Sequence, residues 1–270
     1  MYLAVDIGGT KTLLAAFNDE GQQVSHFKFP TPENYDEFLK QLAENLPKLG
    51  EHDFRAATVA VPGKLDRPHG RVIALGNLPW RNEDIDADLE RITHCPVEIE
   101  NDAKLAGLSE ALILKGEFKR ALYLTFSTGI GIALINDGVI DTNVGDIGGD
   151  GMLLEHNGKL MPWEDFAAGK AIVEKYGKRA SEIDDPNIWR NIVKDMAVGM
   201  IDLIAVLQPE VIIIGGGVGA NFIKFGDLLI ERLKTYETPM MSIPPIRPAV
   251  RAEEAVVYGC FELARARNNG

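Results

Sequence analysis

The chain has 270 residues, of which 46% are hydrophobic, with 40 acidic residues, 28 basic residues and two cysteines. This length predicts one large domain or two lobes that bury a core without disulfides. The net charge of −12 argues against a duplex nucleic-acid partner, because such binding depends on Lys and Arg at phosphates. The sequence lacks an apolar run of the ~18–20 residues that a spanning helix needs, and it lacks a signal-peptide pattern at its start. We therefore expect no membrane partner and a cytoplasmic location.

The first part of the chain alternates between strand and helix patterns. Short apolar runs bounded by Gly, Pro, Asn and Asp predict strands, and apolar residues at helical spacing predict helices. Strands are predicted at residues 2–5, 13–17, 24–29, 56–61 and 97–100, and helices at 33–49, 83–92 and beyond 101.

The same pattern starts again in the second part of the chain. A strand at 121–126, a glycine-rich turn at 127–131 and a strand at 132–135 repeat the opening unit roughly 120 residues later, which predicts a duplicated lobe. A strand is then predicted at 211–214, and helices at 164–177, 188–207, 221–236 and from about 253. We expect an α/β fold with lobes at 1–115 and 116–270, and a final helix at about 253–267 that packs back on the first lobe.

Three glycine-rich turns are candidates for phosphate or nucleotide contact. In the first, Asp6 to Thr12 (DIGGTKT), glycines allow backbone amides to approach a phosphate, Thr10 and Thr12 add hydroxyls, and Lys11 adds a charge. The alternative is a plain hairpin turn. The second, Ser127 to Gly131, occupies the equivalent place in the repeat. The third, Gly215 to Gly219, lies in a poor dinucleotide context, so we interpret it as a close approach to a base or ribose, or as a structural turn.

Asn101 and Asp102 stand between a predicted strand and a predicted helix. Both residue types cap helices, because their side chains accept hydrogen bonds from free amides of the first turn. A carboxylate at such a position can also accept a proton from a substrate hydroxyl. Position alone leaves both interpretations open.

Eight segments follow one another in an order and spacing that is typical of one family: Asp6 to Thr12, Pro62-Gly63, Asn77 to Trp80, Asn101 to Ala103, Ser127 to Gly131 (STGIG), Gly145 to Gly148, Trp163 to Gly169 and Gly215 to Gly217. Together they resemble the ROK family of sugar kinases and repressors. The resemblance covers essentially the whole chain. It implies an actin-like, ribonuclease-H-like fold of two α/β lobes that bind a sugar and ATP in the cleft between them. It also implies a homodimer, since the family is commonly dimeric.

The resemblance implies a role for individual residues. Asp102 would be the general base that takes the proton from the primary hydroxyl of the sugar, and Asp6 would hold Mg²⁺ through water. The sugar ligands would be Asn101, Asp102, Asp146, Glu164, Gly63 and Asn77. The ATP ligands would be Gly8, Gly9, Thr10, Lys11, Ser127, Thr128, Gly129, Gly215, Gly216 and Gly217.

The chain departs from the family in the sugar loop. The family usually has Gly-Glu-Ile-Gly-His, where this chain has Gly145 to Gly149 with Asp146 in place of the Glu. The family's zinc site, made by that His and three cysteines, has none of its four ligands here, so we expect no zinc. We expect His156 to be a solvated loop residue. We also expect the loop to be held by packing of Leu153, Leu154, Leu160 and Trp163.

The leading hypothesis is an ATP-dependent hexose kinase, with glucose as the first candidate substrate. N-acetylmannosamine, N-acetylglucosamine, fructose and allose are alternative acceptors, and polyphosphate is a weaker alternative donor because no Lys/Arg cluster is present. The other hypothesis is a sugar sensor or regulator without catalysis. The first motif begins at residue 6, so we expect no DNA-binding domain before it.

Overall fold

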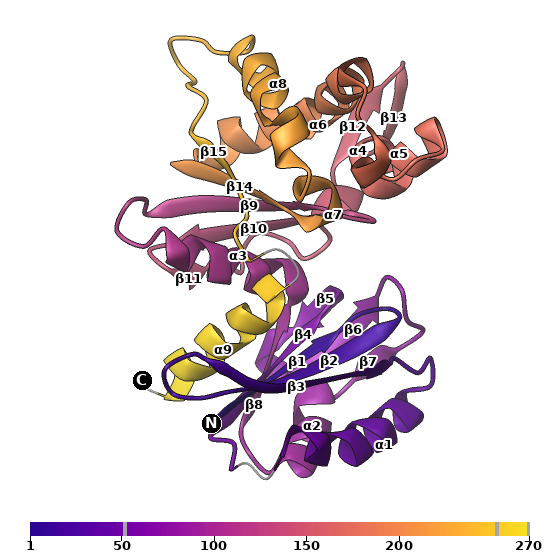
Figure 1. Cartoon of the computed structure of the whole chain (residues 1–270), viewed down its shortest axis with the longest axis vertical. Helices are drawn as coiled ribbons and strands as arrows, with labels where there is room; N and C mark the ends of the chain where they lie inside the picture. Colours follow the sequence, from indigo (N-terminus) through magenta and orange to yellow (C-terminus); the bar gives the residue numbers. More distant parts are fainter. Residues whose placement is uncertain (51–52, 252–253, 269–270) are drawn as a thin grey trace. The chain divides into compact units, whose positions relative to one another are not determined.

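The computed structural model describes residues 1–50, 53–251 and 254–268 (Figure 1). Contacts between residues divide the chain into two compact units, which we name unit 1 (Met1–Ser109 and Glu254–Gly270) and unit 2 (Glu110–Glu253). The division falls inside a helix, a few residues before the boundary expected from the sequence, and that boundary stays a prediction. None of the helices in the described part of the chain is long and apolar enough to cross a membrane.

The main sheet of unit 1 has five strands in the order β3-β2-β1-β4-β8. They are β1 (Tyr2–Ile7), β2 (Lys11–Phe17), β3 (Gln23–Pro30), β4 (Ala56–Val61) and β8 (Val97–Asn101). Short turns make β1, β2 and β3 antiparallel neighbours, whereas the longer connections with helices bring β4 and β8 in parallel to β1. The carboxyl ends of β1, β4 and β8 therefore meet at one edge of the sheet.

Helices and a small second sheet complete unit 1. The helices are α1 (Tyr35–Asn45), α2 (Ile85–Thr93), α3 (Asp102–Ile113, which continues into unit 2) and α9 (Ala255–Asn268), with short 3-10 helices η1 (Leu46–Leu49) and η2 (Arg67–His69). The small sheet contains β5 (Gly63–Asp66), β6 (Arg71–Leu75) and β7 (Arg81–Glu83), which the sequence analysis did not predict. Helix α9 packs on β1 and β4, and its Phe261 stacks on Phe17 at the end of β2 with 5.2 Å between ring centroids. The end of the chain thus returns to the first strand.

The main sheet of unit 2 repeats this arrangement in the order β11-β10-β9-β14-β15. Its strands are β9 (Arg120–Phe126), β10 (Ile130–Asn136), β11 (Val139–Ile140), β14 (Val211–Gly215) and β15 (Ile246–Pro248). Strands β9, β10 and β11 are antiparallel neighbours, and β14 and β15 run parallel to β9, as in unit 1. The duplication predicted from the sequence is confirmed.

The rest of unit 2 packs helices and one hairpin around a core that contains Trp163, Trp189 and Met200. The elements are β12 (Leu153–His156), β13 (Lys159–Pro162), α4 (Glu164–Ala167), α5 (Gly169–Tyr176), α6 (Pro186–Leu207), α7 (Gly216–Gly219), α8 (Phe222–Lys234), η3 (Gly148–Gly151) and η4 (Ala180–Glu182). The helix predicted at 164–177 is two helices, because Ala168 has extended backbone angles and interrupts it.

The predicted packing of the hairpin is half wrong. Trp163 is fully buried and Leu154 packs against the core, but Leu153 and Leu160 are 57% and 69% exposed. Leu153 and Leu160 lie on the other face from Leu154, because residues of β12 and β13 alternate between two faces of the hairpin. Only one face of the hairpin therefore contributes to the core.

Candidate functional site

The turn between β1 and β2 is held tightly from within unit 1. The amide of Gly8 donates to the carbonyl of Lys11 at 3.0 Å, and the hydroxyl of Thr31 donates to the carbonyl of Gly8 at 2.8 Å. A Cβ atom on Gly9 would lie 2.6 Å from Cβ of Asn77, so the turn requires glycine there and brings Asn77 beside it. The side chains of Thr10 and Lys11 are exposed next to this backbone. The arrangement fits a phosphate cradle, in which an added Cβ would fill the space near the backbone.

Thr12 does not belong to this exposed group. It is fully buried, and its hydroxyl lies 2.9 Å from the hydroxyl of Thr31. The prediction that Thr12 adds a hydroxyl donor to the turn was wrong, because residues of β2 alternate and Thr12 points to the interior. Its hydroxyl helps to fix Thr31 instead.

Two carboxylates lie at the edge where the parallel strands of unit 1 end. Asp6 is near the end of β1, and Asp102 begins α3 directly after β8. The pKa of Asp6 is raised to about 7, chiefly by burial and then by the nearby charge of Asp102, while Lys28 lowers it. The pKa of Asp102 is raised to about 6 because of burial, and a hydrogen bond from the amide of Ala103 acts in the opposite direction. Both side chains are partly exposed. A partly buried carboxylate with a pKa near neutral pH is suited to accept a proton.

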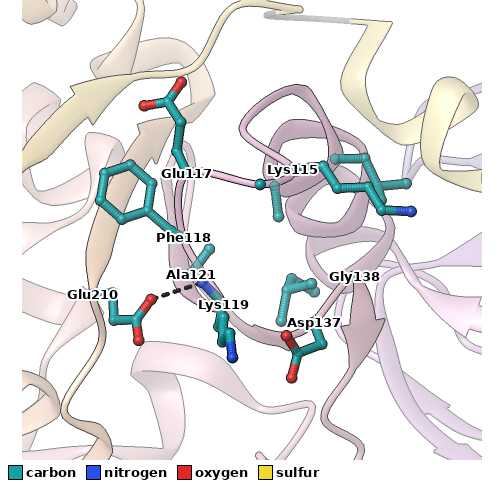
Figure 2. A pocket seen from close by; sticks show the side chains of 12 residues that line it. Lys115, Glu117, Phe118, Lys119, Ala121, Asp137, Gly138 and Glu210 are labelled. Carbon is teal, nitrogen blue, oxygen red and sulfur yellow. Dashed lines mark hydrogen bonds between the residues drawn. The ribbon is translucent and has the colours of Figure 1, made fainter.

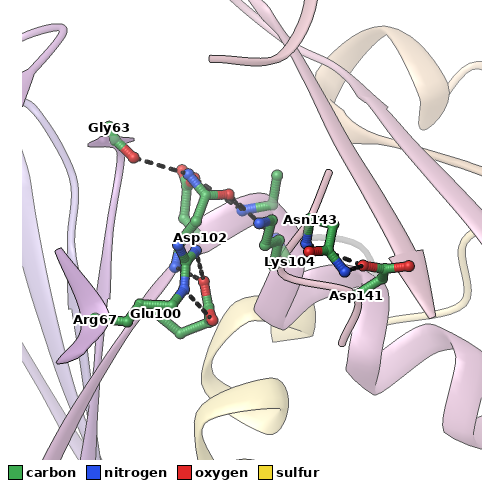
Figure 3. A network of polar contacts seen from close by, with 9 residues as sticks. Gly63, Arg67, Glu100, Asp102, Lys104, Asp141 and Asn143 are labelled. Atoms are coloured by element: carbon green, nitrogen blue, oxygen red, sulfur yellow. Dashed lines mark hydrogen bonds and ion pairs between the residues drawn. The ribbon is translucent and has the colours of Figure 1, made fainter. Parts of the chain in front are cut away.

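Asn101 caps α3 and also contacts Gly63 (Figure 3). Its Oδ1 accepts hydrogen bonds from the amides of Ala103 at 3.0 Å and Lys104 at 3.2 Å, and its Nδ2 donates to the carbonyl of Gly63 at 3.4 Å. The capping interpretation is therefore right for Asn101. Gly63 has a positive φ, and a Cβ atom there would lie 2.2 Å from the carbonyl oxygen of Ala74. The structure thus brings Gly63, Asn101 and Asp102 together.

Arg67 and Glu100 support this segment, and the sequence analysis missed them. Arg67 Nε donates to Glu100 Oε2 at 2.8 Å, and its Nη2 contacts Oε1 (Figure 3). Glu100 is buried, and its Oε1 also accepts from the amide of Asn101 at 2.6 Å. The position of Glu100 in a buried strand could have indicated this contact from the sequence, because a buried carboxylate requires a partner.

In unit 2, the turn Ser127 to Gly129 packs against Glu164. Glu164 Oε2 accepts from the amide of Ile130 at 3.1 Å, and a Cβ atom on Gly129 would lie 2.6 Å from the same oxygen. The carbonyl of Ser127 accepts from the amide of Gly169 at 2.7 Å. Burial raises the pKa of Glu164, and the amide of Ile130 lowers it. The sequence analysis predicts that Glu164 binds the sugar and that this turn binds ATP. The structure places Glu164 and the turn side by side.

Two further candidates of unit 2 lie near the same turn. A Cβ atom on Gly216, which has a positive φ, would lie 2.5 Å from the carbonyl oxygen of Phe126, the residue before the turn. The loop that contains Asp146 packs on Ile130, where a Cβ atom on Gly148 would lie 2.2 Å from the Ile130 carbonyl oxygen. Space around Gly217 is open. Glu164, Gly216 and the loop that contains Asp146 therefore lie around one turn.

The expectation for His156 was wrong. It lies on β12 rather than in a loop, its side chain is 19% exposed, and its ring stacks on Phe166 with 4.3 Å between centroids. Its Nδ1 is 3.8 Å from a carboxylate oxygen of Asp195. Nothing near it in the sequence indicates this contact, because Asp195 is on α6.

Among the described residues, no three His, Cys, Asp or Glu side chains are grouped to hold a metal ion. Mg²⁺ does not require such a group, because it is bound by one or two carboxylates together with water and phosphate oxygens. Asp6, at the edge of the sheet beside the cradle-like turn, fits that mode.

A separate cavity of about 440 Å³ lies in unit 2 between the end of α3 and the strands β9 and β10 (Figure 2). Its charged lining includes Glu210, which accepts from the amide of Lys119 at 2.7 Å, and Glu117, which pairs with Arg247 at 3.0 Å. None of the candidate residues lines this cavity. It is therefore distinct from the sites described above.

Comparison with known proteins gives one family. The sequence model of the ROK family matches residues 2–267. The chain is 25% identical to a glucokinase of Streptomyces coelicolor, over 97% of each chain. It is 26% identical to an N-acetyl-D-glucosamine kinase of Haemophilus influenzae, over 97% of this chain and 99% of the relative. The crystal structure of a ROK hexokinase from Thermus thermophilus superimposes with a TM-score of 0.82 at 26% identity, over 100% of this chain and 99% of that one.

Proposed function

Because the chain belongs to the ROK family, we propose that it is a sugar kinase that transfers the γ-phosphoryl group of ATP to the primary hydroxyl of a hexose, with glucose as the first candidate. The observation that carries the proposal is the pair of partly buried carboxylates with raised pKa values, Asp6 and Asp102, where the parallel strands of unit 1 end. The fold alone does not carry it, since one fold hosts many functions.

Asp102 is proposed as the general base. Its pKa, raised by burial to about 6, leaves most of the side chain ionised above pH 7 while keeping it a better proton acceptor than an exposed aspartate. Asp102 Oδ1 accepts from the amide of Ala103 at 2.8 Å, which orients the carboxylate at the start of α3. Asp102 would take the proton of the sugar hydroxyl as that oxygen attacks phosphorus.

Each unit offers polar groups for the sugar. In unit 1 these are Asn101, Asp102, Asn77 and the backbone of Gly63, and in unit 2 they are Asp146 and Glu164. The hydrogen bond between Asn101 and Gly63 supports this set in unit 1, and the bond from Ile130 to Glu164 holds that carboxylate in unit 2. Asp146 has a shorter side chain than the Glu usual in the family, which is a reason to test several sugars.

The glycine turns would bind ATP. Gly8, Gly9, Thr10 and Lys11 would contact phosphate in unit 1, as would Ser127, Thr128 and Gly129 in unit 2, and Gly215 to Gly217 would contact adenosine. Asp6 would hold hydrated Mg²⁺, which when bound neutralises charge on the phosphates. In such transfers positioning and charge stabilisation supply most of the catalysis.

An assay of ADP release tests the proposal. The protein would be given ATP, Mg²⁺ and, in turn, glucose, N-acetylglucosamine, N-acetylmannosamine, fructose and allose, and glucose is expected to give the highest kcat/KM. A reaction series with polyphosphate in place of ATP compares the donors. If another hexose gives the highest kcat/KM, the proposal of a kinase stands and the proposed substrate changes to that hexose. Binding of a sugar without turnover on any of them would favour the sensor instead.

A further inference from the structure

A buried carboxylate on α6, Asp195, connects three other segments of unit 2. Its side chain is 9% exposed, and its Oδ2 accepts a hydrogen bond from Nζ of Lys175 on α5 at 3.0 Å. Its Oδ1 lies 3.8 Å from Nδ1 of His156 on β12, a favourable electrostatic contact when the imidazole is protonated. Its backbone carbonyl accepts from the indole N–H of Trp163 at 3.2 Å. One point of α6 therefore contacts the hairpin, α5 and the residue that precedes α4.

Packing alone does not explain a carboxylate at this position. The neighbouring residues on α6, Ile192, Val193 and Met196, belong to the apolar core of unit 2. A buried carboxylate costs free energy unless it is paired, and an apolar side chain of similar size usually serves the fold as well or better. The ammonium of Lys175 supplies that pairing, and the imidazole of His156 adds to it when protonated.

Residues on both sides of Glu164 in the sequence, Trp163 and Phe166, are packed against the segments that Asp195 contacts. Trp163, directly before Glu164, is fully buried and meets Phe126 edge to face at 5.5 Å between ring centroids. Its ring also fits against Gly199, one turn beyond Asp195 on α6. On the other side of Glu164, Phe166 stacks on the ring of His156. The backbone on both sides of Glu164 is thus attached to residues that contact Asp195.

We propose that Asp195 is a positioning residue for Glu164. Together with Lys175 and His156 it fastens the β12–β13 hairpin and the Trp163–Glu164 segment to α6, in a loop that contains no cysteine to hold a metal ion. The side chain of Glu164 is then kept against the amide of Ile130. This inference rests on the proposed function only in taking Glu164 as a sugar ligand; the fastening itself is a property of unit 2.

The first test compares Asp195→Asn with Asp184→Asn by backbone hydrogen exchange, without sugar or nucleotide. Asp184 is the matched control, because it also accepts from a lysine, Lys224 at 2.8 Å, but its side chain is 88% exposed. In Asp195→Asn, exchange in residues 153–164 is expected to accelerate at least about tenfold, with α8 and unit 1 unchanged, because local opening is controlled by local contacts. Asp184→Asn is expected to leave residues 153–164 unchanged.

The second test is the split between KM and kcat. A displaced Glu164 would bind the sugar less well in the ground state and the transition state alike, so KM for the sugar is expected to rise about 5–20-fold while kcat stays within about threefold. Lys175→Gln is expected to change KM in the same direction by less, since Lys175 is 49% exposed. Loss of general stability would not give this split.

Two results would overturn the proposal: unchanged exchange at 153–164, or equal acceleration throughout unit 2. If the unaltered protein phosphorylates no sugar, the proposed function fails, and the exchange data still decide whether Asp195 fastens the hairpin. If Asp195→Asn does not fold, His156→Gln and Lys175→Gln carry the same measurement, because both side chains are more exposed than that of Asp195.

Discussion

Asp6, the residue proposed to hold Mg²⁺, acts against the stability of the fold when it is ionised. Its folded-state pKa of about 7 lies above the ordinary value of 3.8, chiefly because of burial and then because of Asp102. The fold therefore favours the protonated form. The contribution of this group to stability is complete below pH 3.8 and is lost as the pH rises through about 7.

We expect Asp6→Asn to stabilise the protein at pH 8 and to have little effect at pH 4. The amide replaces a buried charge at pH 8, and the gain in the free energy of unfolding should be on the order of 1–4 kcal/mol. Thermal unfolding in magnesium-free buffer between pH 4 and pH 8 measures it. Asp227→Asn, at an exposed position of α8, is the control and should show no such pH dependence. A gain that is the same at both pH values would contradict the shifted pKa.

Asp102→Asn tests the general base. The amide has the shape of the carboxylate but does not accept the proton, so kcat should fall by about 10²–10⁴-fold. Sugar binding, measured by calorimetry, should largely survive. Glu98→Gln is the control: Glu98 is on β8 with a pKa raised by burial, but it faces Arg267 at 3.6 Å, and its substitution should leave kcat unchanged. Turnover of Asp102→Asn within tenfold of the parent would reject the assignment.

At the scale of elements, the packing of Trp163 on α6 requires a glycine at position 199 of that helix. A Cβ atom on Gly199 would lie 2.3 Å from the ring of Trp163, which is closer than packed atoms approach. Helix propensity favours alanine over glycine by about 1 kcal/mol, whereas overpacking a core costs about 1–3 kcal/mol or more. The clash should therefore outweigh the propensity.

We accordingly expect Gly199→Ala to lower the free energy of unfolding, by about 1–3 kcal/mol in denaturant titrations. Ala205→Gly, at an exposed site of the same helix, measures the propensity effect alone and should cost about 1 kcal/mol. A Gly199→Ala protein more stable than the parent would show that Trp163 does not pack against α6 as described.

Helices and strands with a clear hydrophobic pattern were predictable from the sequence, whereas short, partly exposed strands were not. The buried strands β1, β4, β9 and β14 are continuous apolar runs, because both of their faces are covered, and α6 carries a long apolar stripe. The small sheet of β5, β6 and β7 and the hairpin of β12 and β13 were missed. Their strands have three to five residues and partly exposed patterns, so they carry little periodic signal.

The candidate site was predictable where it is contiguous in sequence. The turns at Gly8 and Gly129 and the cap at Asn101 stand in short motifs, and the structure shows the close approaches that require those residue types. The partners Arg67 and Glu100 are 33 positions apart, and Lys175 and Asp195 are 20 apart. Such pairs depend on how helices and strands pack, which neither local propensity nor motif spacing determines.

At the scale of the whole molecule, the repeated sheet explains why some of the candidates fall at equivalent places. The glycine turns follow β1 in unit 1 and β9 in unit 2, and Gly63 and Gly216 follow the next strands of the two sheets, β4 and β14. An acidic chain with a net charge of −12 that binds a polyphosphate needs local groups to offset repulsion. Backbone amides in the glycine turns, Lys11 and Mg²⁺ near Asp6 are the groups proposed for that purpose.

The distribution of cysteines leads to a prediction about metals. Both cysteines are buried in unit 1, Cys95 in the core beside α2 and Cys260 on α9, and the sequence of unit 2 contains none. The hairpin and the Glu164 segment therefore have no cysteine within their own unit, and the polar contacts of Asp195 connect them to α6. Structural zinc sites with cysteine ligands contribute directly to folding, so their removal lowers stability.

We expect elemental analysis to find no stoichiometric zinc, and 1,10-phenanthroline to leave both the Tm and turnover unchanged. EDTA should abolish turnover without lowering the Tm, because Mg²⁺ is needed with the phosphates and not for the fold, and added Mg²⁺ should restore the activity. Purification from zinc-supplemented medium is the control for metal lost during preparation. One equivalent of zinc whose removal lowers the Tm would contradict the prediction, and would mean that unit 2 is stabilised by ligands other than thiolates.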